Sequence, residues 1–356
     1  MENMVEQRAF WRGKRVLITG HTGFKGGWLT LWLNSLGAFV VGYSLPPPSS
    51  PNFYSEVGVA DGIASITGDI RQADELQRAV QRYQPEIIFH LAAQALVRPS
   101  YASPVETYTT NVLGTIHVLE AARLAGTVRV VINVTSDKCY ENKETRVAYC
   151  EGDPKGGRDP YSSSKGCAEL VAAAYFSSFF QGTTTGLASV RAGNVIGGGD
   201  WADERLVPDF VRAIVRGQRL RLRSPQAVRP WQHVLEPLNG YLLLAEKLWN
   251  DHQLSGGWNF GPSPDDARTV LWLANRLVEN WESSVSCEIE SGPKPYEAEY
   301  LTINSTKAHS QLNWRPVWQV DQAVKATTDW YRAWQCGQPM REFTLDQIER
   351  YQDDAR

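Results

Sequence analysis

Short runs of apolar and β-branched residues alternate with stretches of helical apolar spacing along the first half of the chain. Four runs predict buried strands: Arg15–Thr19, Ala38–Ser44, Glu86–Leu91 and Val128–Thr135. Between them, apolar residues recur at the helical period in three stretches: Trp28–Leu36, Ala73–Arg82 and Val105–Ala125. This alternation is typical of an α/β fold in which a doubly wound parallel sheet lies between helices.

The pattern changes after residue 192. Glycine, proline, arginine and tryptophan dominate from Gly193 to about Pro230, and helical spacing returns in Trp231–Trp249 and Val270–Trp281. We therefore predict a sheet domain formed mainly by residues 1–192 and a smaller domain formed mainly by residues 193–356. The two are expected to be partly interleaved, because Gly256–Gly261 has the pattern of a late strand. The tail from residue 335 onwards predicts a short helix with a frayed end.

Composition excludes several classes of protein. Of the 356 residues, 42% are hydrophobic and 21% charged, as in globular domains, and the net charge of −3 argues against a nucleic-acid partner. No apolar run reaches the roughly 18 residues of a membrane helix, and the first residues lack the apolar core of a signal peptide. Five cysteines without CxxC spacing predict reduced thiols in the cytoplasm. The six histidines show no metal-ligand spacing, so no metal site is expected.

A glycine-rich loop follows the first predicted strand. It reads Thr19-Gly20-His-Thr-Gly23-Phe24-Lys25-Gly26-Gly and leads into an apolar helix. Glycines at these positions let the backbone turn sharply and approach a pyrophosphate, and the helix that follows directs its N-terminal amides at that anion. The strand before the loop and the helix after it make a phosphate site the stronger interpretation; the alternative is a turn without a ligand.

A second cluster of reactive side chains follows the fourth strand. Ser136, Asp137 and Lys138 are consecutive at its carboxyl end, where ligands bind in open α/β sheets. Tyr161 and Lys165 are four residues apart in a segment that begins Asp159-Pro160, a favourable helix start. Helical spacing places the ammonium beside the phenol, and this predicts a lowered pKa for Tyr161.

The loop and the Tyr-x-x-x-Lys pair together resemble the extended short-chain dehydrogenase/reductase family over most of the chain. The resemblance implies a Rossmann domain that binds NAD and a C-terminal domain that binds a nucleotide-sugar. It also implies that the chain forms a homodimer or a dimer of dimers. Ser44 stands where an acidic residue would hold the adenine ribose, so NADP remains an alternative. The residues that the resemblance assigns to the cofactor are Gly20, Gly23, Phe24, Lys25, Gly26, Asp69, Ile70, Leu91, Ala92, Ala93, Asn111 (a buried structural asparagine), Thr135, Tyr161 and Lys165.

Asp137 and Lys138 distinguish groups within the family. Epimerases that resemble this chain lack an acid directly after the serine, whereas nucleotide-sugar 4,6-dehydratases have one, followed by a second proton-transfer group. Segments at residues 21–28, 135–140, 191–201 and 229–234 resemble the dehydratases that act on CDP-glucose, whose products feed the deoxysugars of surface polysaccharide. The resemblance implies that Tyr161 removes the C4 hydroxyl proton, Asp137 protonates the leaving C6 hydroxyl and Lys138 takes the C5 proton. Lys138 is alternatively an electrostatic partner of Asp137.

Anion-binding side chains downstream complete the predicted site. The phosphates of a nucleotide-sugar suit arginine, and the candidate substrate residues are Asn194, Trp201, Arg205, Arg229, Glu299 and Tyr300. Alternatives remain open: a dehydratase or 4-epimerase for a dTDP-, GDP- or UDP-sugar, or a non-catalytic NAD-binding module.

Overall fold

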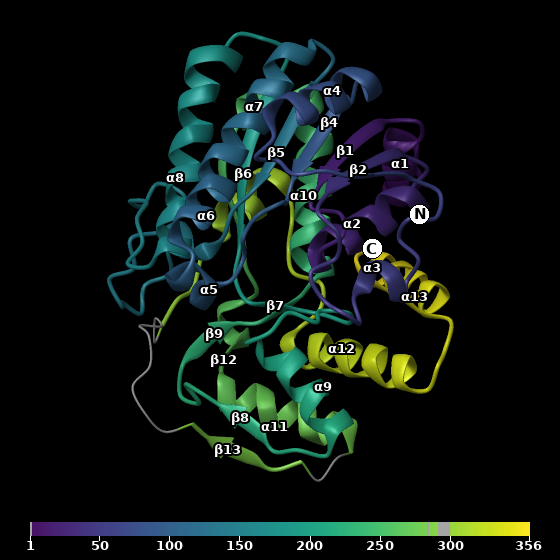
Figure 1. Cartoon of the computed structure of the whole chain (residues 1–356), viewed down its shortest axis with the longest axis vertical. Coiled ribbons are helices and arrows are strands. Elements are labelled where there is room, and N and C mark those ends of the chain that lie inside the picture. The colour runs from purple at the N-terminus through teal and green to yellow at the C-terminus, as the bar shows by residue number, and fades with distance from the viewer. Residues whose placement is uncertain (1, 283–284, 291–299) are drawn as a thin grey trace.

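Seven parallel strands form the central sheet, in the order β11-β6-β5-β4-β1-β2-β3. The computed structural model describes residues 2–282, 285–290 and 300–356 (Figure 1). The strands are β1 (Arg15–Thr19), β2 (Phe39–Ser44), β3 (Ala64–Thr67), β4 (Ile87–His90), β5 (Val130–Val134), β6 (Gly186–Ala192) and β11 (Gly256–Phe260). This is the doubly wound order, whose direction reverses between β1 and β4, so a ligand crevice is expected at their carboxyl ends. The predicted fold class is confirmed.

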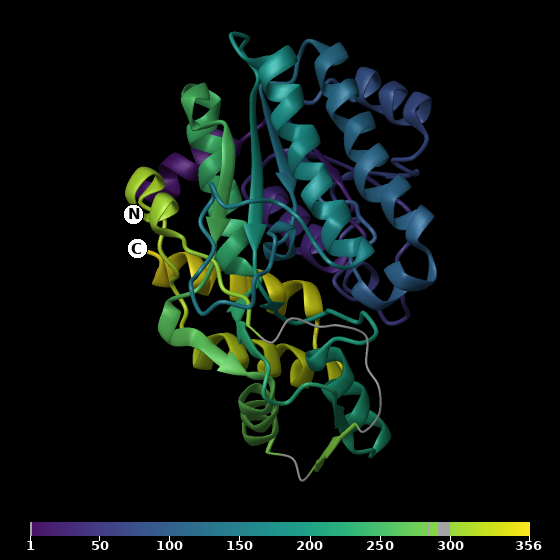
Figure 2. The same ribbon diagram turned by 90° about the vertical axis from the view of Figure 1, so that its left-hand side faces the viewer.

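Alternate residues of the strands pack into two separate hydrophobic cores, one on each face of the sheet. Val16 and Ile18 pack on one face and Leu17 on the other, because successive side chains of a strand point in opposite directions. One face is covered by α4 (Ala73–Tyr83), α7 (Gly114–Ala125) and α8 (Pro160–Tyr175), and the other by α2 (Phe24–Ser35), α10 (Leu235–Asn250) and α13 (Met340–Asp354). The view in Figure 2 shows helices on both sides of the strands.

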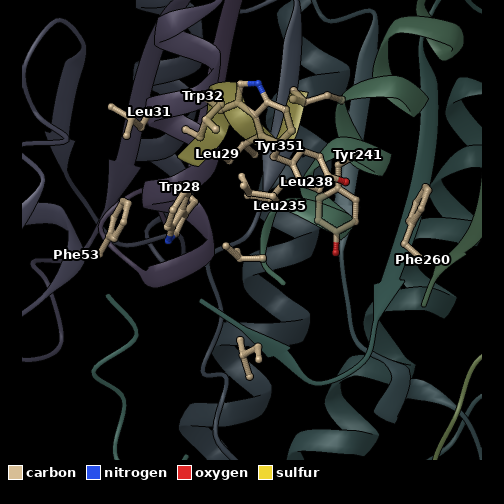
Figure 3. Packing of buried hydrophobic residues seen from close by; sticks show 14 of the residues in the cluster. Trp28, Leu29, Leu31, Trp32, Phe53, Leu235, Leu238, Tyr241, Phe260 and Tyr351 are labelled. Carbon is tan, nitrogen blue, oxygen red and sulfur yellow. The ribbon is translucent and has the colours of Figure 1, made fainter. Parts of the chain in front are cut away.

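Aromatic side chains fill the face of the sheet beneath α2 and α10. Trp28 and Trp32 of α2, Tyr241 of α10 and Tyr351 of α13 are all at most 1% exposed, and Figure 3 shows them converging from three helices. Tyr351 is fully buried, so the prediction of a short frayed tail is wrong: α13 is a 15-residue helix that belongs to the core. Each fully buried aromatic side chain of this kind contributes about 2–3 kcal/mol by area.

The second part of the chain lies at the carboxyl ends of the strands (Figure 1). Within the described residues, it contains three helices and three strand pairings of two or three residues each, and it sends β11 back into the sheet, as predicted. Its elements are β7 (Val195–Ile196), α9 (Leu206–Arg216), β8 (Leu220–Leu222), β9 (Val228–Pro230), β10 (Gln232–His233), β12 (Ala267–Thr269), α11 (Val270–Trp281), β13 (Cys287–Ile289) and α12 (Val320–Gln335). The boundary at residue 192 stays a prediction.

Shorter helical segments connect these elements. They are α1 (Glu2–Trp11), α3 (Phe53–Glu56), α5 (Val97–Ala102), α6 (Pro104–Tyr108), the π-helices η1 (Thr109–Leu113), η3 (Phe176–Phe180) and η6 (Ala308–Leu312), and the 3-10 helices η2 (Asp137–Cys139), η4 (His252–Leu254) and η5 (Pro264–Asp266). The helix predicted over residues 105–125 is thus three consecutive segments, α6, η1 and α7. Within the described ranges, no helix is both long and apolar enough to cross a membrane.

Candidate functional site

The glycine loop packs tightly at the carboxyl end of β1. Gly20 has a φ of +81°, and a Cβ there would lie 2.7 Å from the backbone nitrogen of Ala92. A Cβ on Gly26 would lie 2.1 Å from the carbonyl oxygen of Gly20. At Gly23, by contrast, the nearest atom to a Cβ is 3.4 Å away, so this side of the loop is open. Gly23 is the N-cap of α2, and the residues present therefore fit a pyrophosphate held at that helix start.

The segment after β4 lies beside this loop, and the segment after β3 lies at the same edge of the parallel sheet. Leu91 and Ala92 donate their backbone N–H groups to the hydroxyl of Thr19, each at 3.2 Å, which places Leu91–Ala93 next to the glycines. Asp69 follows β3 and accepts hydrogen bonds from the Arg71 guanidinium at 2.6 and 2.8 Å, which lowers the pKa of its carboxyl. Ile70, the next residue, is 3% exposed.

Ser44 and Asn111 bond to protein groups around the cofactor segments. The Ser44 hydroxyl lies 2.8 Å from that of Thr22 in the glycine loop. Asn111 is 2% exposed and donates to the carbonyl of Gln94 at 2.9 Å and to the hydroxyl of Ser164 at 2.8 Å. It therefore ties the segment after β4 to α8, as a structural asparagine would.

Ser136, Asp137 and Tyr161 meet just past the end of β5. Ser136 caps η2 and donates its hydroxyl to Oδ1 of Asp137 at 2.9 Å, and it shares a hydrogen bond with Tyr161. The second oxygen of Asp137, Oδ2, is buried and has no hydrogen-bond partner among the described residues. Lys138 is half-buried, one residue further along the same turn. The structure thus brings the predicted acid and the predicted phenol together.

The start of α8 positions Tyr161 and Lys165 as the sequence predicts. Asp159 is the N-cap, with Oδ1 accepting from the Ser162 backbone N–H at 2.9 Å. The prediction of a lowered pKa for Tyr161 is wrong. Burial raises this pKa to about 12, because a phenolate loses its hydration there, although the hydrogen bond between Tyr161 and Ser136 opposes the increase. Lys165 donates to the carbonyl of Val134 at 3.2 Å, and burial lowers its pKa to about 8.

Positive charge surrounds these groups more closely than sequence reasoning indicated. Burial, and then the neighbouring Arg205, lower the pKa of Lys25 to about 8, while Asp137 and Asp200 oppose them. Lys25 thus lies within electrostatic reach of the Asp137 carboxylate as well as on the glycine loop. Arg205 forms an ion pair of 2.9 Å with Asp200, which holds the pKa of Arg205 above its usual range. Asp200 was missed, although it lies in the 191–201 segment, five residues before Arg205.

The remaining substrate candidates lie on the second part of the chain. Trp201 is 7% exposed and packs against Tyr331 and Trp334 of α12, and its role in substrate binding stays a prediction. Arg229 lies on β9, and Tyr300 forms a bridge to the neighbouring Val228, which places these two candidates side by side. The carbonyl of Asn194 accepts from the backbone N–H of Gln232 at 3.1 Å. Glu299 lies outside the described residues.

The cysteines and the possible metal ligands bear on two further expectations from the sequence. All five cysteines are free thiols. In the part of the chain that the structure describes, no group of three His, Cys, Asp or Glu side chains is arranged to hold a metal ion.

Comparison with known proteins gives a consistent result. The family model described as GDP-mannose 4,6 dehydratase matches residues 17–327. CDP-glucose 4,6-dehydratase of Salmonella typhimurium is 47% identical over 348 residues, which cover 96% of this chain and 97% of that protein.

Solved structures share the fold. A dTDP-glucose 4,6-dehydratase from Streptomyces venezuelae with NAD bound has a TM-score of 0.79 at 24% identity, covering 91% of this chain and 98% of its own. A UDP-glucose 4-epimerase from Thermotoga maritima also has a TM-score of 0.79, at 22% identity, covering 90% of this chain and 99% of its own. At these identities the likeness shows the fold alone.

Proposed function

The chain belongs to the family described as GDP-mannose 4,6 dehydratase, and from that membership we propose that it converts CDP-D-glucose to CDP-4-dehydro-6-deoxy-D-glucose with NAD bound. The observation that carries the proposal is the 47% identity to a CDP-glucose 4,6-dehydratase over nearly the whole of both chains, together with Asp137 beside Ser136 and Tyr161. The product is a precursor of deoxysugars.

The open side of the glycine loop supports the cofactor assignment. We propose that Gly20, Gly23 and Gly26 hold the pyrophosphate against the start of α2 and that Leu91–Ala93 line its ribose. When bound, NAD supplies the acceptor for the C4 hydride and returns that hydride to C6, so no net oxidation occurs. Ser44 leaves the ribose without a carboxylate partner, and NADP is the alternative to test by titration.

Three proton transfers fall to side chains after β5 and on α8. Tyr161 removes the proton of the C4 hydroxyl, and Ser136 holds the oxygen of that hydroxyl. Because burial raises the pKa of Tyr161 to about 12, its ionisation depends on nearby cations, and Arg205 lowers that pKa. The ketone at C4 then acidifies C5, Lys138 takes the C5 proton, and Asp137 protonates the departing C6 hydroxyl, which leaves as water. A final proton, from Tyr161 or a solvent-linked group, is added to C5 as the hydride reaches C6, and this completes the 4-keto-6-deoxy product.

Asp137 has the environment that this acid role requires. Its Oδ2 atom is buried without a partner in the described residues, so it can bond a substrate hydroxyl directly. We assign Arg205 and Arg229 to the substrate diphosphate, with Asn194 and Tyr300 beside them, because guanidinium groups bind phosphate through paired hydrogen bonds. Trp201 stays a substrate candidate as well as a packing residue, because its indole N–H is buried without a partner among the described residues.

A direct assay tests the reaction. The protein is incubated with CDP-glucose and NAD, and the alkaline absorbance of a 4-keto sugar is followed, with UDP-, dTDP- and GDP-glucose in parallel. We expect the chromophore with CDP-glucose in preference to the others. Preference for another nucleotide would assign a different dehydratase. A 4-epimerase would interconvert sugars without the chromophore, and a non-catalytic module would leave every substrate unchanged.

An exposed apolar surface supports the proposal of a homodimer, or a dimer of such dimers. Val105, Leu113 and Leu124 on α6–α7 and Leu170 and Phe179 on α8–η3 are 43–75% exposed, and α7 packs beside α8. Two copies of this helix pair would bury these side chains in a four-helix contact. Light scattering should give at least twice the chain mass of 39.8 kDa, and Leu170→Asp should reduce it to one chain.

A further inference from the structure

A buried ion pair lies directly behind the catalytic turn. Arg191 of β6 binds Glu169 of α8 through two parallel hydrogen bonds, Nε to Oε1 at 2.7 Å and Nη2 to Oε2 at 2.6 Å. Their side chains are only 3% and 5% exposed. Apolar residues of similar volume often stabilise a core as well as such a pair does. Packing alone therefore does not explain the pair, and its remaining hydrogen bonds indicate that it fixes the position of neighbouring residues.

These remaining bonds reach both ends of the catalytic segment 135–140. At one end, Thr135 donates its hydroxyl to Oε1 of Glu169. At the other end, Nη1 of Arg191 donates to the hydroxyl of Tyr140 at 2.6 Å, and that hydroxyl donates onward to Oδ1 of Asn259 at 2.7 Å. Between these two anchors lie Ser136, Asp137 and Lys138.

The turn between the anchors has little intrinsic rigidity. Residues 137–139 form a single 3-10 turn, whose hydrogen-bond geometry is weaker than that of an α-helix. Glu169 is also one helical turn beyond Lys165 on α8, so the same carboxylate lies behind both halves of the site. A displacement of about 1 Å between an acid, a base and a substrate can cost roughly a hundredfold in rate.

We propose that Glu169 and Arg191, acting through Thr135 and Tyr140, are positioning residues that hold Asp137 and Lys138 in line with Tyr161 during the elimination of water. The inference rests on the proposed dehydration. It concerns two buried residues behind the site, Glu169 and Arg191, which determine where the acid and the base stand.

Two stacked tyrosines provide a matched test. The rings of Tyr140 and Tyr149 stack at 5.2 Å and are 1% and 7% exposed. Tyr140→Phe removes the hydroxyl that links Arg191 to Asn259 but keeps the ring, including its contact with the Lys155 ammonium at 4.4 Å. Among the described residues, the hydroxyl that Tyr149→Phe removes bonds within its own loop, to Asn142 and to the backbone N–H of Lys143.

Both variants are compared with the unchanged protein in kcat, KM, NAD affinity and thermal unfolding, well below their melting temperatures. We expect Tyr140→Phe to lower kcat about tenfold with KM and NAD affinity within about twofold, and Tyr149→Phe to keep kcat within about twofold. The loss should fall on elimination, so Tyr140→Phe should accumulate more reduced cofactor in a single turnover than the unchanged protein does.

The outcomes separate the two proposals. If the unchanged protein makes no 4-keto sugar, the proposed function fails. If it does, and Tyr140→Phe retains full kcat or the two variants lose it equally, the positioning role is overturned and the ion pair is structural.

Discussion

A methyl group added at Gly23 should weaken NAD binding while leaving the stability of the fold nearly unchanged. The φ of Gly23 is −81°, which alanine adopts freely, and the nearest atom to the new Cβ is the carbonyl oxygen of Gly20 at 3.4 Å. At an N-cap, alanine is less favourable than glycine by some tenths of a kcal/mol, and the reduced entropy of the unfolded chain offsets this. We therefore expect the free energy of unfolding of Gly23→Ala to stay within about 1 kcal/mol of the unchanged protein.

Binding should respond differently, because the methyl group occupies the open side of the loop. A pyrophosphate displaced by it loses one or two charge-assisted hydrogen bonds from backbone N–H groups, each worth about 1.5–3 kcal/mol. This predicts an increase of about 10-fold to 100-fold or more in the dissociation constant of NAD, measured by calorimetric titration.

Gly26→Ala is the contrasting variant. Its Cβ would lie 2.1 Å from the Gly20 carbonyl oxygen, so the loop itself must open. Forced overpacking of this kind costs about 1–3 kcal/mol, and we expect Gly26→Ala to lose stability and NAD affinity together. Native NAD affinity in a stable Gly23→Ala protein would refute the placement of the pyrophosphate at this loop.

Three further predictions follow from individual side chains. Lys138→Met should lower both C5 deuterium incorporation in D₂O and loss of water about 100-fold or more, and normal rates would remove Lys138 as the base. Asp159→Ala removes the N-cap of α8 and should destabilise the protein by about 1 kcal/mol in denaturant titration; an unchanged midpoint would contradict the capping role. Burial raises the pKa of Glu236 from 4.5 to about 7, so the folded state holds this proton more tightly. The free energy of unfolding is therefore greatest below pH 4.5, the pKa of this carboxyl in the unfolded chain. It should fall by about 3 kcal/mol as the pH rises from there through about 7, the pKa in the folded state. Glu236→Gln should flatten that slope in thermal unfolding, and an unchanged slope would assign it to other groups such as Glu246.

The strands and helices with strong periodicity were predictable, and the exceptions have physical reasons. β1 and α11 match their predicted bounds, because their apolar residues alone determine their period. The short edge strand β3 was missed because half of its residues are exposed. β6 was missed because it carries Ser189 and Arg191, which are buried only because Asn133 and Glu169 bond them from distant parts of the chain.

The site residues also divide into those that were predictable from the sequence and those that were not. Local spacing was sufficient to predict the glycine loop, the Asp159 cap and the order of the groups after β5. The pKa of Tyr161 was not predictable, since it depends on burial by elements distant in sequence. The burial of Trp201 was not predictable for a related reason, since it depends on contacts with Tyr331 and Trp334 of α12, which are distant in sequence.

The backbone leaves the choice between epimerisation and dehydration open, since enzymes of both kinds share this fold. Epimerisation requires a C4 proton acceptor and a hydride carrier, and Tyr161 with the glycine loop would provide both. Elimination requires in addition an acid that reaches the C6 oxygen. Asp137 has one oxygen held by Ser136 and the other buried without a partner in the described residues, an arrangement that costs free energy unless a ligand completes it. A protein that only oxidised and reduced C4 would have no use for that oxygen, so Asp137 is the side chain that favours dehydration.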